Sequence, residues 1–525
     1  MKINFSRVMG LMAMRFGDRP ALVNVERNRR YSYRQLHRVT NRIAAMLRDG
    51  LKVGAGDNVM LILDNDNLSL LHFPVAWKQE GTFVFTNFRD SAEEHAWQID
   101  LVKPKAVILE AALVDRYYEL LRAQGCAIVA MDPLPSPREG VLDFWQLVEA
   151  ASDAETDVEL DVENHIALLR FTGGTTGRGK CAMYAIDTFL GMRDGAFICP
   201  DYDFGEDMRV LHFAPLSHGT MMLYVPTLFA GGMTCTQNLP DLEQWCRVVE
   251  AERITHSFLV PTLLYRLLDL PAAKTHDLSS LTTIIYGAAP MSPSRLGDLI
   301  KKFGQIFVQG YAATEAAMMV CALGKAQHNQ DSEAAIRRLA SAGQVQPGVE
   351  IFIADDDGNP LPAGETGEIM IRCRAIIKGY YKNPEGTAQE FLNGAWRSGD
   401  LGYIDEDGYV FIVDRKKDMI ISGGFNVYAV EVEAALASHP AVLMSAVVGV
   451  PHPEWGEAVH AEIVLRPGVA ASADDLIAHA KSHISGYKVP KSVAIVEQLP
   501  ISVVGKVIRR AVREKYWKDA GRKVG

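Results

Sequence analysis

Glycine, threonine and lysine residues between positions 172 and 180 have the composition of a phosphate-binding loop. Glycine lets backbone N–H groups approach a bulky anion closely, and a run of such groups forms an anion-binding nest. Threonine hydroxyl groups and a lysine ammonium group add charge-assisted hydrogen bonds to phosphate oxygens. The pattern therefore predicts a phosphate site made by Thr172, Gly173, Gly174, Thr175, Thr176, Gly177 and Lys180.

The same residues partly match the Walker signature of nucleotide hydrolases, G-x-x-x-x-G-K followed by Ser or Thr. Here Cys181 follows the lysine, and residues 181–186 alternate as in a strand, whereas a Walker loop opens a helix. The pattern therefore favours a strand, a phosphate loop and a second strand. A plain turn between two strands is the alternative, but it does not explain so many phosphate-binding groups.

The segment FTGGTTGRGK resembles the loop of the adenylate-forming enzymes, usually written Y/F-T-S-G-T-T-G-x-P-K-G. Gly173, Gly179 and Cys181 stand where that family has Ser, Pro and Gly. These departures remove one hydroxyl group and loosen the loop, so they bear on phosphate affinity more than on the assignment.

Further motifs follow in the order found in that family. APLSHGT (214–220) resembles the segment whose histidine, here His218, borders the entrance for a carboxylic acid. A histidine satisfied within the core is the alternative. IIYGAAP (284–290) resembles the small-residue segment that lies against adenine, and GYAATE (310–315) resembles Y-G-x-T-E, with Ala312 in place of Gly.

The resemblance assigns roles to single residues. In the family's terms Tyr311 stacks on adenine, Thr314 reaches phosphate, and Glu315 holds Mg²⁺, a metal that takes few ligands from protein. Asp400 in RSGDLG and Arg415 in DRKKD match the residues that hold the ribose hydroxyl groups. The full implied ATP site adds Gly287, Ala288, Ala289, Pro290, Gln309, Gly310 and Ile412, and the implied catalytic set is Lys506, His218, Thr314 and Glu315.

Alternating strand and helix patterns predict an α/β fold with largely parallel sheets. The expected strands include 59–64, 106–109, 127–131, 256–260, 282–287 and 305–311, and residues 5–16 have helical spacing. Residues 132–165 are rich in proline and acidic residues, so we expect them to form a linker. A chain of 525 residues favours more than one domain. We expect a large N-terminal domain (1–416) and a small mobile α+β domain (417–525), with a hinge at Lys417.

The resemblance also locates the remaining substrates. The turn containing Ser422, Gly423, Gly424 and Phe425 would line the channel for coenzyme A. The acid would lie against flexible methionines and small residues, namely Met221, Met222, Ala312, Ala313 and Met318. Methionines that only fill the core are the alternative. This composition predicts a medium-to-large hydrophobic acid, whether fatty, aromatic or alicyclic, and not acetate.

Composition limits the partners. A formal charge of −10 argues against nucleic acid. Seven scattered cysteines without a C-x-x-C pair indicate reduced thiols. Since no apolar run reaches about 18 residues and no signal-peptide pattern is present, we expect a cytoplasmic protein with at most peripheral membrane contact. Homodimers are common among members of the family.

Together these motifs identify the chain as a member of the adenylate-forming superfamily, nearest the acyl-CoA synthetases. The implied reaction uses ATP, Mg²⁺ and coenzyme A to convert a carboxylic acid to a thioester through an acyl adenylate. One alternative is an adenylating enzyme that loads a carrier protein. The others are a phosphate-loop ATP hydrolase and a binding protein without catalysis.

Overall fold

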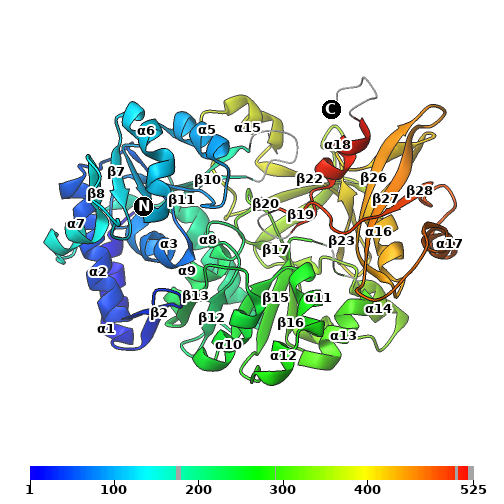
Figure 1. The fold of residues 1–525 in the computed structure, drawn as a ribbon, viewed down its shortest axis with the longest axis horizontal. Helices are drawn as coiled ribbons and strands as arrows, with labels where there is room; N and C mark the ends of the chain where they lie inside the picture. The colour runs from blue at the N-terminus through cyan, green and yellow to red at the C-terminus, as the bar shows by residue number, and fades with distance from the viewer. Residues whose placement is uncertain (173–178, 290, 292, 503–505, 518–525) are drawn as a thin grey trace.

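The computed structural model describes residues 1–172, 179–289, 291, 293–502 and 506–517. The protein has a mixed α/β fold with a large N-terminal domain and a small C-terminal domain, which lies on the right in Figure 1 in orange and red. The large domain contains two mainly parallel sheets and one antiparallel sheet. Within the described ranges, no helix is long and apolar enough to cross a membrane.

The first parallel sheet has seven strands. In spatial order they are β11 (Cys181–Ala185), β10 (Ile166–Phe171), β5 (Thr82–Phe85), β4 (Asn58–Ile62), β6 (Ala106–Leu109), β7 (Ala127–Ala130) and β8 (Val141–Asp143). Only the β10–β11 pair is antiparallel. Helices α5 (Ala92–Val102) and α6 (Val114–Gln124) pack on one face, where side chains such as Ile99 and Leu121 are buried. Burial on both faces explains why β4 reads as a continuous apolar run.

The second parallel sheet has nine strands. They are β18 (Gln344–Val345), β17 (Met319–Leu323), β16 (Phe307–Ala312), β15 (Thr283–Gly287), β14 (His256–Leu259), β12 (Arg209–His212), β13 (Met233–Thr236), β2 (Pro20–Asn24) and β3 (Arg29–Ser32). Strands at the two edges are antiparallel to their neighbours. Helices α10 (Leu242–Glu252), α11 (Pro261–Asp269) and α13 (Pro293–Phe303) cover one face.

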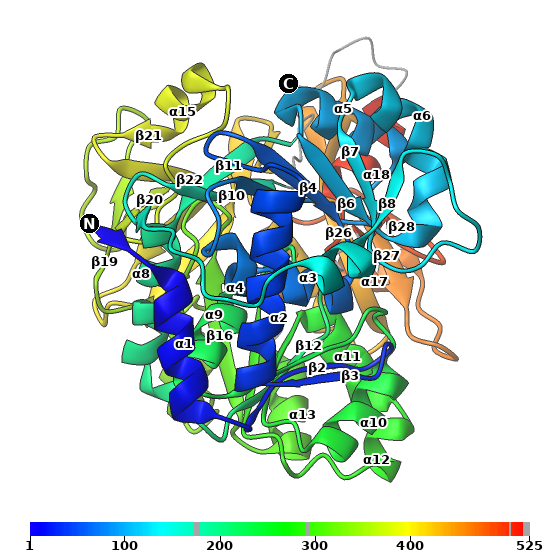
Figure 2. The same ribbon diagram turned by 90° about the vertical axis from the view of Figure 1, so that its left-hand side faces the viewer.

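The core between these two sheets holds α8 (Ile186–Ile198) and α9 (Met221–Ala230), whose apolar side chains join the largest buried cluster. Helices α1 (Phe5–Phe16) and α2 (Tyr33–Ala45) lie side by side near the N-terminus, as Figure 2 shows. Ser32 and Gln35 form a capping box that begins α2. The predicted helix 5–16 is confirmed, with Phe5, Met9 and Phe16 buried.

The antiparallel sheet of the large domain contains β19 (Val349–Ala354), β20 (Gly367–Cys373), β22 (Ala395–Ile404) and β21 (Phe391–Leu392), with β23 (Val410–Arg415) paired to β22. The small domain contains β24 (Ile420–Ser422), β25 (Phe425–Val427), β27 (Gly456–Leu465), β26 (Val442–His452) and β28 (Ser492–Ile495), with α16 (Ala429–Ala437), α17 (Ala473–His483) and α18 (Arg509–Trp517).

The predicted linker 132–165 is wrong in part. This segment supplies β8 to the edge of the seven-stranded sheet and contains α7 (Phe144–Ala150) and β9 (Leu160–Asp161). Phe144 and Val148 are buried in the main core. Proline and acidic residues dominate the composition of the segment, so a few apolar anchors at helical spacing were overlooked.

Candidate nucleotide and acid site

The glycine-rich loop connects two antiparallel strands, as its sequence predicts. Thr172 donates its backbone N–H to the carbonyl oxygen of Lys180 at 2.8 Å, and the Lys180 N–H donates to the Thr172 hydroxyl at 3.0 Å. A Cβ atom at Gly179 would lie 2.2 Å from the Thr172 carbonyl oxygen, so the base of the loop requires glycine. The predicted phosphate ligands Gly173, Gly174, Thr175, Thr176 and Gly177 lie outside the described residues.

Lys180 is part of a network that the sequence did not reveal. Its ammonium group forms an ion pair with Glu390 and lies 4.8 Å from the centre of the Tyr380 ring. The Tyr380 hydroxyl donates to Glu315 at 2.9 Å and also contacts Glu390. Burial raises the pKa of Glu315, and the Tyr380 hydrogen bond opposes that rise. Tyr380 lies in the segment GYYKNPEGT, which resembles the family, but it and Glu390 follow the loop by about 200 residues, so the sequence did not predict their contact with Lys180.

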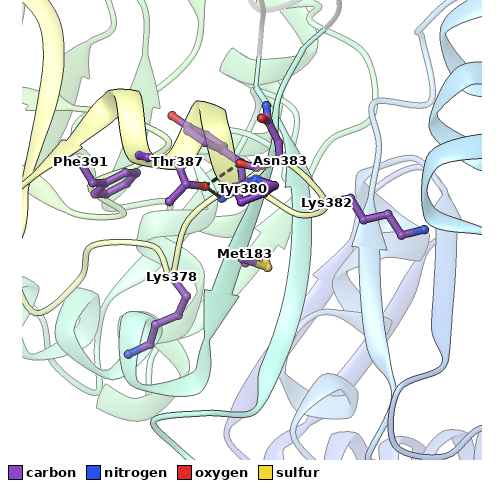
Figure 3. Close-up of a pocket in the computed structure, with 9 residues that line it drawn as sticks. Met183, Lys378, Tyr380, Lys382, Asn383, Thr387 and Phe391 are labelled. Atoms are coloured by element: carbon purple, nitrogen blue, oxygen red, sulfur yellow. Dashed lines mark hydrogen bonds between the residues drawn. The ribbon is translucent and has the colours of Figure 1, made fainter.

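A pocket of about 500 Å³ lies beside Tyr380, between β11 and α15 (Pro384–Glu390). Figure 3 shows Lys378 and Lys382 on opposite sides of it, each directed away from Tyr380. Its lining contains none of the predicted site residues. This pocket is therefore not the one that the predicted site residues would form.

Glu315 satisfies the requirements of a magnesium ligand only in part. Mg²⁺ prefers hard oxygen ligands and is commonly bound by one or two carboxylates together with substrate phosphates. Glu315 is a part-buried carboxylate, and Glu390 shares its Tyr380 partner. Among the residues that the structure describes, no group of three or more His, Cys, Asp or Glu could hold a metal. This donor set fits an ion whose other ligands come from a bound nucleotide and water.

The predicted adenine segment lies at the carboxyl end of β15. Gly287 pairs with Gly310 of β16, and a Cβ atom at Gly287 would lie 2.2 Å from the Gly310 carbonyl oxygen. The chain then turns through Ala288 with a φ of +68°, a conformation that side chains rarely adopt. Gln309 is held by the Tyr286 hydroxyl at 3.0 Å and by the Ser341 carbonyl. Ala289 follows in this turn, whereas Pro290 lies outside the described residues.

Tyr311, Asp400 and Arg415 come together although about 90 residues separate the first two. The Tyr311 hydroxyl donates to Asp400 at 2.6 Å, and the Arg415 Nε lies 3.3 Å from the same carboxylate. The pairing of β22 with β23 places Asp400 opposite Arg415. Burial and the Asp400 charge raise the pKa of Tyr311 well above its ordinary value, so it remains a neutral donor. Ile412, on the same strand as Arg415, is part-buried against the main core.

Lys506 of the small domain is directed at this group of residues. Its pKa is lowered to about 8 by burial and by the positive charges of Arg415 and Arg170, while Asp400 opposes the shift. Burial and the positive charges of Arg170 and Lys506 lower the pKa of His218 to about 3, so this histidine is neutral at physiological pH. Lys506 is therefore within electrostatic range of Asp400, Arg415, Arg170 and His218.

Arg170 is a further charged residue of this site that the motif analysis missed. It lies on β10, two residues before the glycine-rich loop, and its side chain is 8% exposed. Its guanidinium group contacts the Tyr184 hydroxyl at 3.5 Å and the Met221 sulfur at 3.7 Å. Tyr184 in turn donates to the Thr314 carbonyl oxygen at 2.6 Å. The sequence signal that could have identified Arg170 is the presence of a charged residue within the apolar strand β10.

Of the residues predicted to contact the acid, Met221 is the one with a recorded contact to this guanidinium. Met221 and Met318 are buried in the main core, and Ala313 packs against the same cluster. Met222 and Ala312 are part-buried against a second cluster that contains Met319 and Phe258. Their contact with an acid stays a prediction.

The hinge and the predicted coenzyme A turn lie in the small domain. Gly423 and Gly424 have φ angles of +58° and +84° in a two-residue hairpin between β24 and β25, and Phe425 stacks near Tyr487 at the surface. Lys417 is exposed in a turn. Charged contacts cross the connector nearby, because Arg509 of α18 lies 3.8 Å from Asp414 and 2.6 Å from Glu433.

Comparison with known proteins identifies the family. Residues 12–381 match the family described as AMP-binding enzyme, and residues 431–506 match the AMP-binding enzyme C-terminal domain. The chain belongs to the AMP-binding enzyme family. This assignment agrees with the resemblance seen in the glycine-rich loop and with the joint presence of Asp400, Arg415 and Lys506 at one site.

Individual members of the AMP-binding enzyme family are similar over nearly the whole chain. The medium/long-chain-fatty-acid–CoA ligase FadD8 of Mycobacterium tuberculosis is 38% identical over 447 residues, which cover 83% of this chain and 77% of that protein. A feruloyl-CoA synthase of an Amycolatopsis species is 34% identical over 492 residues, covering 92% and 94%. The crystal structure of ATP-bound MatB from Rhodopseudomonas palustris superposes with a TM-score of 0.86 at 27% identity, covering 98% and 100%.

Proposed function

We propose that the protein is an ATP-dependent acyl-CoA synthetase that acts on a medium-to-large hydrophobic carboxylic acid through an acyl-AMP intermediate. The observation that carries this proposal is the position of Lys506. The ammonium group of Lys506 is buried within electrostatic range of Asp400, Arg415 and Arg170 of the large domain, and its charge also acts on His218. Relatives named for fatty-acid and feruloyl substrates support the acid class.

In the first half-reaction, a carboxylate oxygen of the acid attacks the α-phosphorus of ATP, and the bond to pyrophosphate breaks. Both reactants are anionic, so a cation between them lowers the repulsion that opposes their approach. Lys506 would supply that cation, while Asp400 accepts hydrogen bonds from the ribose and Tyr311 supports the adenine ring. Lys180, released from Glu390, would bind the departing phosphates.

Mg²⁺ held by Glu315 would neutralise charge on the pyrophosphate leaving group. The Tyr380 hydrogen bond occupies one oxygen of the part-buried Glu315 carboxylate and would leave the other for the metal.

In the second half-reaction, the sulfur of coenzyme A attacks the acyl carbon and AMP leaves with the electron pair of the broken bond. The groups needed for this step differ from those of the first, so we propose that the small domain, residues 417–525, rotates about Lys417. Lys506 then withdraws, and the turn from Ser422 to Phe425 lines the path of the pantetheine arm. The exposed Gly423 and Gly424 leave room for that arm close to the backbone.

The proposed location is the cytoplasm. All seven cysteines are free thiols, and five of them are buried. Burial raises the pKa of thiols such as Cys181, to about 12, which keeps it protonated and unreactive. A reducing compartment suits a protein of this kind.

The test is a screen of carboxylic acids for AMP release. We expect AMP and pyrophosphate to form with a fatty, aromatic or alicyclic acid only when coenzyme A is present for turnover. Turnover with a carrier protein but not with coenzyme A would instead support the carrier-loading alternative. ATP hydrolysis without acid would support a hydrolase, against which the strand that follows Lys180 already argues.

A further inference from the structure

Three buried side chains beside the proposed acid site have nitrogen atoms without a hydrogen-bond partner in the described part of the chain. They are Nε of Arg170, Nε2 of His72 and Nε2 of His212. The exposed fractions of the three residues are 8%, 1% and 0%. Buried polar groups in folded proteins are nearly always hydrogen-bonded, so three orphaned nitrogens in one region require an explanation.

All three residues lie around the first turns of α9, the helix that follows His218. Arg170 contacts Met221 at the start of α9. The His72 ring is centred 4.7 Å from the Tyr224 ring of the same helix, and the His212 ring 5.7 Å from it. Burial lowers the pKa of His72 to about 3, and the nearby charges of His212 and Arg170 act in the same direction.

Two of these nitrogens can only donate. The backbone N–H of Phe73 donates to Nδ1 of His72 at 2.8 Å, so Nδ1 is the acceptor and Nε2 of the neutral ring carries the hydrogen. Arg170 has donors only, and its guanidinium group makes long contacts, of 3.5 Å to the Tyr184 hydroxyl and 3.7 Å to the Met221 sulfur. Nδ1 of His212 lies 2.8 Å from the Thr220 hydroxyl, so either tautomer is compatible with its position.

The partner of such a pair must be an acceptor. A carbonyl or carboxylate oxygen accepts hydrogen bonds without needing to donate one, whereas a hydrocarbon chain would leave both donors unpaired. Two other cations of the site have an anionic neighbour in Asp400, since Arg415 lies 3.3 Å from it and Lys506 is within its electrostatic range. Arg170 is within electrostatic range of Lys506 and Glu315, but its guanidinium group contacts Tyr184 and Met221.

We propose that Arg170 and His72 form a specificity subsite that binds a carbonyl or carboxylate oxygen on the apolar body of the acid, away from the carboxylate that reacts. This inference rests on the proposed synthetase function and narrows its substrate class. The preferred acid is a hydrophobic acid with a keto group or a second carboxylate at one position, not a plain hydrocarbon acid.

The experiment compares acids of one length. Decanoate, a series of oxodecanoates with the keto group at successive carbons, and decanedioate are assayed for CoA-dependent AMP release, and their binding is measured by calorimetry in the presence of AMP. We expect kcat/KM and affinity to rise about ten- to a hundredfold over decanoate at one keto position or for decanedioate, as for a hydrogen bond to a charged group. The keto series and the diacid distinguish the two kinds of oxygen.

Variants then assign the preference to these residues. Arg170→Met keeps the length of the side chain without its donors, and His72→Asn keeps an acceptor for the Phe73 N–H but removes the Nε2 donor. Each is expected to reduce the preference for the oxygenated acid by at least about tenfold more than it reduces kcat/KM for decanoate. Thr234→Val removes another buried, unpartnered polar atom, on β13, and should leave the preference unchanged.

Equal kcat/KM and equal affinity for all the acids would overturn the proposal, and so would ordered water on these nitrogens in a complex with decanoate. An Arg170→Met variant that weakens every acid equally would also overturn it, since the guanidinium would then serve the reacting carboxylate. If Arg170→Met fails to fold, His72→Asn and the wild-type keto series decide. AMP release from no acid would contradict the proposed function, and the binding measurements would still decide on the subsite.

Discussion

The ionisation of Lys506 should control the first half-reaction but not the second. Burial and two neighbouring guanidinium groups lower the pKa of this lysine from its ordinary value of 10.5 to about 8. The protonated form is the one that can bridge two anions. Adenylate formation should therefore lose its cation as the pH rises through about 8, well before an exposed lysine would lose its proton.

The size of the effect follows from the titration. With a pKa of about 8, Lys506 is about 90% protonated at pH 7 and about 10% protonated at pH 9. The kcat/KM for adenylation should fall about tenfold across this interval, because kcat/KM reports the free enzyme. Bound phosphates stabilise the ammonium form, so the corresponding break in kcat should move to higher pH.

The assay is pyrophosphate exchange for adenylation and CoA acylation from synthetic acyl adenylate for the second step. The thiolate of coenzyme A is the nucleophile, and a thiol has a pKa of about 8.5, so thioester formation should become faster over the same interval. The two half-reactions should thus have opposite slopes between pH 7 and 9.

Lys506→Arg provides the control, since a guanidinium group stays charged above pH 12. Even if this variant is less active, its kcat/KM for adenylation should not fall between pH 7 and 9. Lys506→Ala should lose adenylation and retain conversion of supplied adenylate. A wild-type kcat/KM for exchange that stays constant from pH 7 to 9 would refute the assignment of the bridging cation to this lysine.

Four other substitutions test separate parts of the proposal. Lys417→Pro fixes φ near −65° in the connector, so it should preserve pyrophosphate exchange and lose thioester formation; equal loss of both steps would argue against rotation there. Lys180→Ala should raise the KM for ATP about ten- to a hundredfold, because a charge-assisted contact with phosphate is lost. Glu315→Gln should raise the Mg²⁺ concentration needed for half-maximal rate. If neither value changed, the proposed phosphate site would be wrong. Ala312→Trp should shift kcat/KM toward shorter acids because an indole ring would fill space next to Met222, and an unaltered chain-length profile would place the acid elsewhere.

Much of the fold could be predicted from the sequence because buried parallel strands are short apolar runs between helices. The strand at 106–109 is confirmed at both ends, and the strand after Lys180 is confirmed as β11. The two domains were also predicted. The segment 132–165 was misjudged, since its composition is that of a linker while Phe144 and Val148 anchor it in the core.

The site was predictable only where residue types form local motifs. Asp400 and Arg415 lie in two recognisable segments, and their strands place them opposite each other. Tyr380, Glu390 and Arg170 act through contacts with residues distant in the sequence, which spacing along the chain does not encode. Arg170 was the exception, because burying a guanidinium group in an apolar strand is costly, and an arginine at such a position indicates a specific role.

The charged contacts around Arg509 have a mechanical consequence for the proposed rotation. Arg509 joins Asp414, at the end of the large domain, to Asp418 and Glu433 of the small domain, close to the connector. In a rigid rotation, displacement grows with distance from the axis, so contacts near the connector move little and can persist in both arrangements. These contacts then favour neither arrangement over the other. The charge of the molecule in the nucleotide site, which attracts Lys506, would decide between them, and ATP, acyl adenylate and AMP would each select an arrangement without any change around Arg509.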